Sequence, residues 1–243
     1  MSEQVLLYSG GLDAFAINQL YDPDTLVFVH PGTEEADKEM EMLLDQGISI
    51  EIVNMQFLSE REEEDKVIPY RNTFFALAGG LYGDEVMLGA THGDGIDTAD
   101  TTTAWASTVE AVLRQHTESW QSQEMSPSVK LPVKSYTKSE LVEKLISEEE
   151  LTLEEIHEQT KSCHYGTIEK GCGECFGCVR RFVAFGANAH LNALYAEDVN
   201  DFFQADIVDY CRRNIDELQD KMSGRGTEYQ SFCTYMNHIG VLD

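Results

Sequence analysis

Short apolar runs alternate with amphipathic segments along the first 133 residues. The apolar runs predict five strands, at residues 5–8, 26–29, 48–53, 86–89 and 129–133. Between them, apolar residues at helical spacing predict helices, at residues 14–21, 34–46, 73–82 and 103–119. Nearly continuous apolar strands are typical of a parallel sheet that helices cover on both faces. The order predicts an α/β fold, doubly wound around a five-stranded parallel sheet.

The later part of the chain carries helical signals. Thr137 with Glu140, and Thr152 with Glu155, have the spacing of capping boxes, which predicts helices at 138–147 and directly after Thr152. Further helical patterns follow at 183–195 and 199–222. The acidic run 59–66 and the polar stretch 121–128 are too short to divide domains, and we interpret them as loops or solvated helix faces.

The net charge of the chain limits the classes of molecule that it is expected to bind. The 243 residues hold 17 Lys+Arg against 44 Asp+Glu, a formal charge of −27, which disfavours broad binding of nucleic acids or anionic membranes. Adaptation to high salt and plain solubility explain this excess equally well. No apolar run approaches the ~20 residues that span a bilayer, and the first residues lack a signal-peptide pattern. We therefore expect a cytoplasmic protein with no membrane partner.

Four of the six cysteines fall in one C-x8-C-x2-C-x2-C cluster: Cys163, Cys172, Cys175 and Cys178. Four thiolates complete a tetrahedral Zn²⁺ site, and such a closed site is structural, not catalytic. Two disulfides are the alternative, but they require an oxidising compartment. The pattern thus predicts three segments: a nucleotide-binding α/β domain at 1–150, a helical zinc-binding segment at 151–185 and a helical extension at 186–243.

The first strand leads into Ser9-Gly10-Gly11-Leu12-Asp13 and then a helix. This arrangement directs backbone N–H groups and a helix N-terminus toward an anion at the carboxyl edge of the sheet. Asp13 cannot bind phosphate directly, but it can hold the loop or share Mg²⁺ with a nucleotide. An ordinary strand-to-helix connection is the less favoured alternative.

Scattered cations and one acidic loop fall where a nucleotide site needs them. Arg71 precedes a predicted helix, Lys134 and Lys138 follow the last predicted strand, and Arg180 and Arg181 follow the last cysteine of the cluster. Each alone is best interpreted as a solvated surface charge, yet together they can line the carboxyl edge. The loop at 89–100 contains Asp94, Asp97 and Asp100, which can bind Mg²⁺ or accept hydrogen bonds from a purine-like N–H edge, although such carboxylates also cap helices, as Asp100 can here. His92 in the same loop can act as a general base or simply be exposed.

Taken together, these residues resemble the 7-cyano-7-deazaguanine synthases, the QueC-type branch of the PP-loop ATP pyrophosphatases, over residues 4–185. The family's Ser-Gly-Gly-x-Asp loop matches residues 9–13, and its Arg-Asn pair matches Arg71 and Asn72. Its loop aspartates match Asp94 and Asp100, and its Pro-x5-Lys-x-Glu element matches residues 132–140. Its cysteine cluster, which ends in Cys-x-x-Arg, matches residues 163–181.

Several positions depart from the family pattern. Ala14 replaces the last serine of the loop, Tyr70 replaces the glycine before Arg-Asn, and His164 replaces a tyrosine. The family's Tyr-Pro-Asp-Cys is Thr-Ala-Asp-Thr at 98–101, and residues 33–35 are Thr-Glu-Glu in place of Gln-Arg-His. Loss of one hydroxyl from a loop built of backbone amides costs about 1 kcal/mol, so the departures bear more on the substrate than on ATP.

The resemblance implies ATP-dependent conversion of 7-carboxy-7-deazaguanine and ammonia to 7-cyano-7-deazaguanine, with Mg²⁺, by a homodimer that binds no nucleic acid. It implies catalytic roles for Asp13, Arg71 and Lys138. Nucleotide contacts fall on Ser9, Gly10, Gly11, Leu12, Asp13 and Lys138, and substrate contacts on Arg71, Asn72, Asp94, Asp100 and Arg181. One alternative is an adenylating enzyme with a different carboxylate, protein or tRNA acceptor. Another is a non-enzymatic zinc module, which leaves the loop at 9–13 without a purpose.

Overall fold

The computed structural model describes residues 3–63, 66–95, 99–120, 127–161, 163 and 171–185. The chain divides into two compact units, Met1–Ala90 with Asp97–Lys134, and Thr91–Ile96 with Ser135–Asp243. These units are divided differently from the predicted segments 1–150, 151–185 and 186–243, because residues 135–150 group with the later part of the chain. We describe each unit by itself.

The first unit is built around a parallel sheet. Its strands are β1 (Gln4–Leu7), β2 (Thr25–His30), β3 (Glu51–Asn54), β4 (Glu85–Leu88) and β5 (Ser128–Lys130). They lie in the order β3-β2-β1-β4-β5, and every pairing is parallel. The order reverses between β1 and β4, which is the switch point where doubly wound folds bind ligands. The predicted fold class is confirmed.

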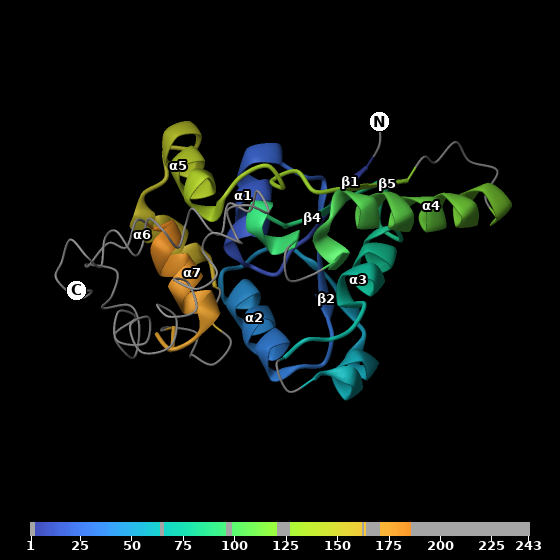
Figure 1. Cartoon of the computed structure of the whole chain (residues 1–243), viewed down its shortest axis with the longest axis horizontal. Coiled ribbons are helices and arrows are strands. Elements are labelled where there is room, and N and C mark those ends of the chain that lie inside the picture. Colours follow the sequence, from blue (N-terminus) through green and yellow to red (C-terminus); the bar gives the residue numbers. More distant parts are fainter. Residues whose placement is uncertain are drawn as a thin grey trace, which may run out of the picture. The chain divides into compact units, whose positions relative to one another are not determined.

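Helices cover both faces of this sheet. Helices α1 (Leu12–Tyr21) and α2 (Glu34–Asp45) lie on one face, and α3 (Arg71–Gly79) and α4 (Thr103–Trp120) lie on the other (Figure 1). The unit also holds two short 3-10 helices, η1 (Gln56–Arg61) and η3 (Ala99–Thr101). Right-handed crossovers explain the layers, because the chain moves outward from β1 to β3 and then returns to the other side of β1.

The apolar composition of the strands follows from the helices on both faces of the sheet. Alternate residues of the three central strands pack under α3 into one buried cluster: Val5, Leu7, Val27, Val29, Val86 and Leu88. Their neighbours Leu6, Phe28 and Met87 are equally buried, at 0 to 2% exposure, and successive strand residues point to opposite faces. Both faces therefore require apolar side chains.

Two predicted strands differ from the observed ones by more than one residue at an end. The strand expected at 48–53 begins only at Glu51, because its ladder with β2 starts at the pair Val27 and Glu51. It is an edge strand with mostly exposed side chains, so its apolar pattern is weak. The strand expected to reach 133 ends at Lys130, and a turn follows.

The second unit is helical in its described part. It contains the 3-10 helix η2 (His92–Gly95) and helices α5 (Lys138–Glu148), α6 (Leu153–Gln159) and α7 (Phe176–Ala184). Both predicted capping boxes are present, at Thr137 with Glu140 and at Thr152 with Glu155. The buried residues come from all three helices: Leu141, Leu145, Ile156, Val179 and Phe182.

Of the last two predicted helices, only the one at 183–195 is tested, and only at its start. A helix expected from residue 183 instead begins at Phe176 and ends at Ala184, since Cys175 caps it with its sulfur. Residues 186–195 and 199–222 lie outside the described part of the chain. No described helix is both long and apolar enough to cross a membrane.

Candidate functional site

The loop after β1 has the backbone of an anion cradle. Gly10 adopts a left-handed φ of 73°, and Gly11 is the N-cap residue of α1 without any side-chain cap. The Ser9 hydroxyl accepts a hydrogen bond from the Gly11 N–H at 3.4 Å. Helix α1 begins at Leu12, with Asp13 in its first turn. The first N–H groups of an α-helix have no acceptor within the helix, so a helix N-terminus is suited to binding an anion.

Close packing fixes this loop within the first unit. A Cβ atom at Gly10 would overlap the terminal methyl group of Met42 and lie 3.2 Å from Leu43 Cδ2. A Cβ atom at Gly89, directly after β4, would lie 3.0 Å from the Ala14 nitrogen and from the Asp13 Cβ. Gly89 therefore permits the end of β4 to pack against the start of α1, and Gly10 permits the loop to pack against α2.

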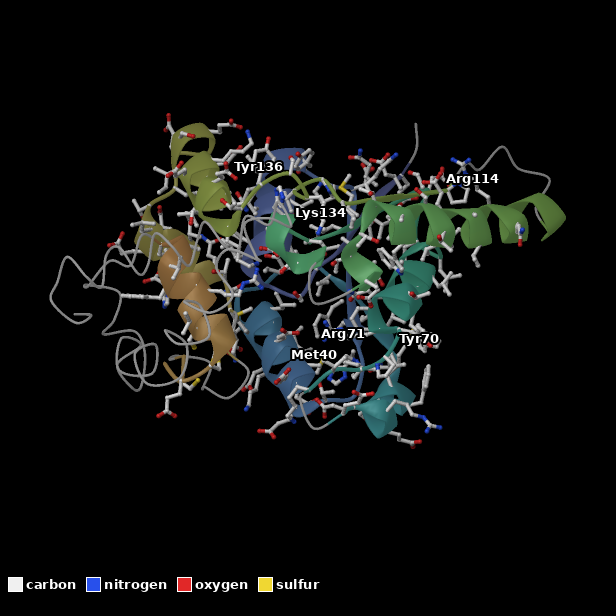
Figure 2. The ribbon with its side chains drawn as sticks, viewed as in Figure 1. Met40, Tyr70, Arg71, Arg114, Lys134 and Tyr136 are labelled. Carbon is white, nitrogen blue, oxygen red and sulfur yellow. The ribbon has the colours of Figure 1, made fainter. Side chains whose placement is uncertain are left out.

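Arg71 and Asn72 begin α3 in the same unit (Figure 2). The Arg71 side chain is exposed, with its guanidinium 6.0 Å from the Phe75 ring centre. Asn72 Nδ2 donates to the Asp100 carbonyl oxygen at 3.4 Å, so the structure brings these two predicted substrate residues together. The contact uses the Asp100 backbone and leaves its carboxylate for another partner.

Tyr70 accounts for one departure from the family pattern. It precedes α3 with a φ of 62°, in the left-handed region that glycine adopts without penalty. The backbone thus keeps the conformation that the family's glycine favours, although a tyrosine stands at this position. Tyr70 is 75% exposed.

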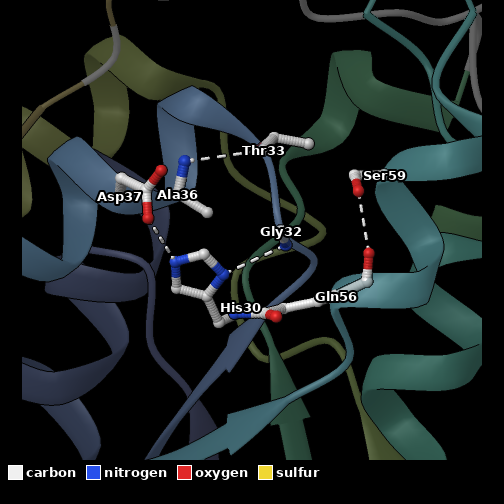
Figure 3. Close-up of polar contacts among 7 residues, drawn as sticks. All are labelled: His30, Gly32, Thr33, Ala36, Asp37, Gln56 and Ser59. Carbon is white, nitrogen blue, oxygen red and sulfur yellow. Dashed lines mark hydrogen bonds and ion pairs between the residues drawn. The ribbon is translucent and has the colours of Figure 1, made fainter.

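A pocket that the sequence did not reveal lies at the carboxyl ends of β2 and β3 (Figure 3). It encloses about 530 Å³ and is lined by His30, Gly32, Asp37, Gln56, Phe57, Ser59 and Glu60. His30 is 3% exposed; its Nδ1 accepts from the Gly32 N–H at 3.0 Å, and its Nε2 lies 3.0 Å from Asp37 Oδ1. These bonds fix the tautomer with a proton on Nε2. The sequence signal for this pocket was His30, a polar residue directly after the apolar run at 26–29.

The second unit holds the cysteine cluster. The Sγ atoms of Cys163, Cys172, Cys175 and Cys178 all lie within 4.8 Å of one another. Cys172 Sγ and Cys178 Sγ are 3.9 Å apart, too far for a disulfide and close to the ~3.8 Å that a tetrahedron of ~2.3 Å Zn–S bonds requires. The residues fit Zn²⁺, and the prediction of a four-cysteine site agrees with their geometry.

Backbone N–H groups donate hydrogen bonds to two of these sulfurs, and such bonds favour the thiolate form. Cys163 Sγ accepts from the Cys172 N–H at 3.1 Å, and Cys172 Sγ accepts from the Glu174 N–H at 3.3 Å. Burial nevertheless raises the pKa of Cys172 to about 12, and hydrogen bonding with neighbouring thiols, together with burial, raises the pKa of Cys178 strongly. The sulfurs therefore become thiolates together only when a cation compensates for their charge.

Asp94 is the centre of a polar network in the second unit. Its Oδ2 accepts from the Thr91 N–H at 2.7 Å and from the Thr91 hydroxyl at 2.6 Å, and its Oδ1 accepts from Arg180 Nη2 at 2.9 Å. Burial by itself raises the pKa of Asp94, but Arg180, Lys138 and the Thr91 hydrogen bonds outweigh it and hold that pKa well below its usual range. Asp94 is thus ionised, and its charge is matched by cations of the same unit.

Arg181 is buried, at 5% exposure, and it joins α6 to α7. Its guanidinium donates to the Thr160 carbonyl at 2.8 Å and to the His157 carbonyl at 2.7 Å, and it lies 5.2 Å from the Phe185 ring centre. Burial, and then Arg181, lower the pKa of His157 to about 4. These contacts indicate a structural role, so the substrate role predicted for Arg181 gains no support from them.

The predicted site residues thus fall into two groups. The first unit holds the loop at 9–13 together with Arg71, Asn72 and Asp100, and the second holds Asp94, Lys138, Arg181 and the four cysteines. The sheet topology places the chain in the class of doubly wound α/β proteins, with a glycine-containing loop between the first strand and the first helix.

Comparison with known protein families shows to which family the chain belongs. The family model described as "Queuosine biosynthesis protein QueC" matches residues 34–189, more than half of the chain. The chain therefore belongs to the QueC family. The match begins at α2, so the loop at 9–13 is an independent observation. No curated protein matches the sequence.

Proposed function

We propose that the protein is an ATP-dependent ligase that converts 7-carboxy-7-deazaguanine and ammonia to 7-cyano-7-deazaguanine. Membership of a queuosine biosynthesis family supports the pathway. The loop at 9–13 carries the proposal of ATP use, because it offers backbone amides and a helix N-terminus at the β1 switch point.

The chemistry proceeds through two activations. A carboxylate oxygen attacks the α-phosphorus of ATP, which releases pyrophosphate and gives an acyl adenylate. Ammonia attacks the carbonyl carbon, AMP leaves with the C–O electron pair, and loss of a proton gives the amide. The amide oxygen then attacks the α-phosphorus of a second ATP, and a second pyrophosphate leaves. AMP departs with the C–O electron pair, and loss of both N–H protons gives the nitrile. This sequence needs orientation and charge stabilisation more than a protein nucleophile.

We assign residues of the chain to these tasks as the family resemblance implies. Ser9, Gly10, Gly11 and Leu12 would bind the departing pyrophosphate through the loop and the first turn of α1. Asp13 would hold Mg²⁺, whose charge would neutralise the phosphates when it is bound. Arg71 and Lys138 stabilise charge at the phosphates and carboxylate, and Asn72 and Asp100 bind the substrate.

The four-cysteine zinc site has a structural part in this proposal. All four coordination positions are filled by sulfur, so it leaves none open to activate water. Reduced thiolates also suit the cytoplasm, which we propose as the compartment. Small molecules are the proposed partners of a homodimer, and the charge of −27 argues against nucleic acid.

A second candidate keeps adenylation but changes the acceptor. Its support is local: residues 33–35 lack the family's Gln-Arg-His, and in this region His30 and Asp37 hydrogen-bond to each other and line a pocket. A different carboxylate, a protein terminus or a tRNA base would then take the place of the deazaguanine.

The deciding experiment incubates the protein with ATP, Mg²⁺, ammonium and 7-carboxy-7-deazaguanine and follows products by mass spectrometry. The proposed function predicts the nitrile together with two AMP for each nitrile formed. AMP release that depends on another acceptor, without nitrile, would favour the second candidate. A Ser9→Ala/Asp13→Asn variant, which removes two side chains of the loop, is the control for contaminating activity.

A further inference from the structure

The charged network around Asp94 connects the loop after β4 to helix α7, which Cys175 caps and which contains Cys178. Thr91 follows β4 in the chain, and residues 92–95 form η2. Asp94 holds this turn closed through its two hydrogen bonds from Thr91. The His92 N–H donates to the Tyr136 carbonyl at 2.9 Å, which fixes the turn to the chain just before α5.

The third attachment comes from α7. Cys175 caps this helix by accepting from the Cys178 N–H at 3.4 Å, so two cysteines of the cluster set its first turn. Arg180 lies two residues after Cys178 and reaches Asp94 at 2.9 Å, with both side chains only 17% exposed. A charge pair so shielded from water is costly to break on one side alone, because the remaining charge loses its partner.

We infer that Asp94 is a positioning residue, which through Arg180 makes the shape of loop 91–95 depend on an intact zinc cluster. The inference deepens the proposed function, on which it rests for the role of this loop at the substrate. It gives the metal a task beyond local stability: zinc fixes the start of α7, α7 fixes Arg180, and Arg180 fixes Asp94. The alternative is that Asp94 contacts the substrate itself.

The test compares zinc-loaded full-length Asp94→Asn, Arg180→Gln and the double variant. The asparagine side chain of the first variant retains an oxygen that can accept from Thr91 but lacks the charge that pairs with Arg180. Hydrogen–deuterium exchange of the amides at 91–95 should rise about tenfold in each single variant and no further in the double variant, as coupled residues require. Arg180→Lys should restore part of the protection. Glu148→Gln, which removes an exposed ion pair with Lys144 on α5, is the matched control and should leave exchange unchanged.

Zinc removal supplies the second readout. Chelation should raise exchange at 91–95 in the parent protein by a similar factor but add little in Arg180→Gln. Unchanged exchange in Arg180→Gln, or in the chelated parent, would overturn the inference. These readouts need no substrate, so they stand even if no nitrile is formed.

Kinetics distinguish positioning from contact. If turnover is observed, both single variants should raise KM for the carboxylate substrate about tenfold with a smaller change in kcat, and the double variant should match either one. Additive effects on KM with unchanged exchange would instead assign Asp94 to direct substrate contact and refute the positioning role.

Discussion

Replacement of Gly10 by alanine tests whether the loop after β1 is held by its backbone conformation. Gly10 has a left-handed φ of 73°, which costs an L-residue about 1–2 kcal/mol. The new methyl group would also overlap Met42 and lie 3.2 Å from Leu43, and overpacking of this kind costs about 1–3 kcal/mol. We expect Gly10→Ala to lower the free energy of unfolding by about 2–5 kcal/mol.

Gly47 provides a matched control, because it has a φ of 67° but nothing within 4 Å of an added Cβ. Gly47→Ala should therefore cost only the conformational penalty of about 1–2 kcal/mol. Urea denaturation of the two variants separates strain from overlap, and ATP titration measures the effect on the loop. Equal stability losses, together with unchanged ATP affinity in Gly10→Ala, would refute the reasoning that this loop is a tightly packed cradle.

Four further predictions address the chemistry and the second unit. With ¹⁸O-labelled 7-carboxy-7-deazaguanine, adenylation should transfer label to AMP and release pyrophosphate, whereas ADP as the stoichiometric product would exclude adenylation. Arg71→Ala and Lys138→Ala should each lower turnover far more than stability, while the exposed Arg61→Ala should lower neither; parent-like turnover in both would contradict the assigned site. Metal analysis of freshly reduced protein should find one Zn²⁺ per chain. The Cys175→Ser variant should lose this zinc, and its second unit should be less stable, because structural zinc contributes about 10–16 kcal/mol of apparent binding free energy. The pKa of His157 is lowered from 6.5 to about 4, so its contribution to stability is full above pH 6.5 and is lost as the pH falls toward 4. The denaturation midpoints at pH 7 and pH 5 should therefore differ less in His157→Gln than in the parent. An equal difference would show that His157 is not the group responsible.

Most of the sheet could be predicted from the sequence because the central strands are covered on both faces. Their apolar runs are continuous, and the edge strand β3, with one neighbour and exposed side chains, is the one whose start was misplaced. The helices after Thr137 and Thr152 were equally accessible, since a capping box is a local signal that the folded chain reproduces. Helix α7 was missed at its start because a cysteine sulfur, not an oxygen side chain, caps it.

The sequence by itself determined the features that depend on neighbours along the chain: the glycine loop after β1, the cysteine spacing and the capped helices. Only the tertiary structure decided which charges meet. Asp94 and Arg180 are 86 residues apart, and no periodic pattern links them. Arg181, adjacent to Arg180, is buried and donates to two backbone carbonyls, a structural environment that the family motif did not indicate. The physical reason is that an ion pair is set by the distance between charges and by exclusion of water, and packing alone establishes both.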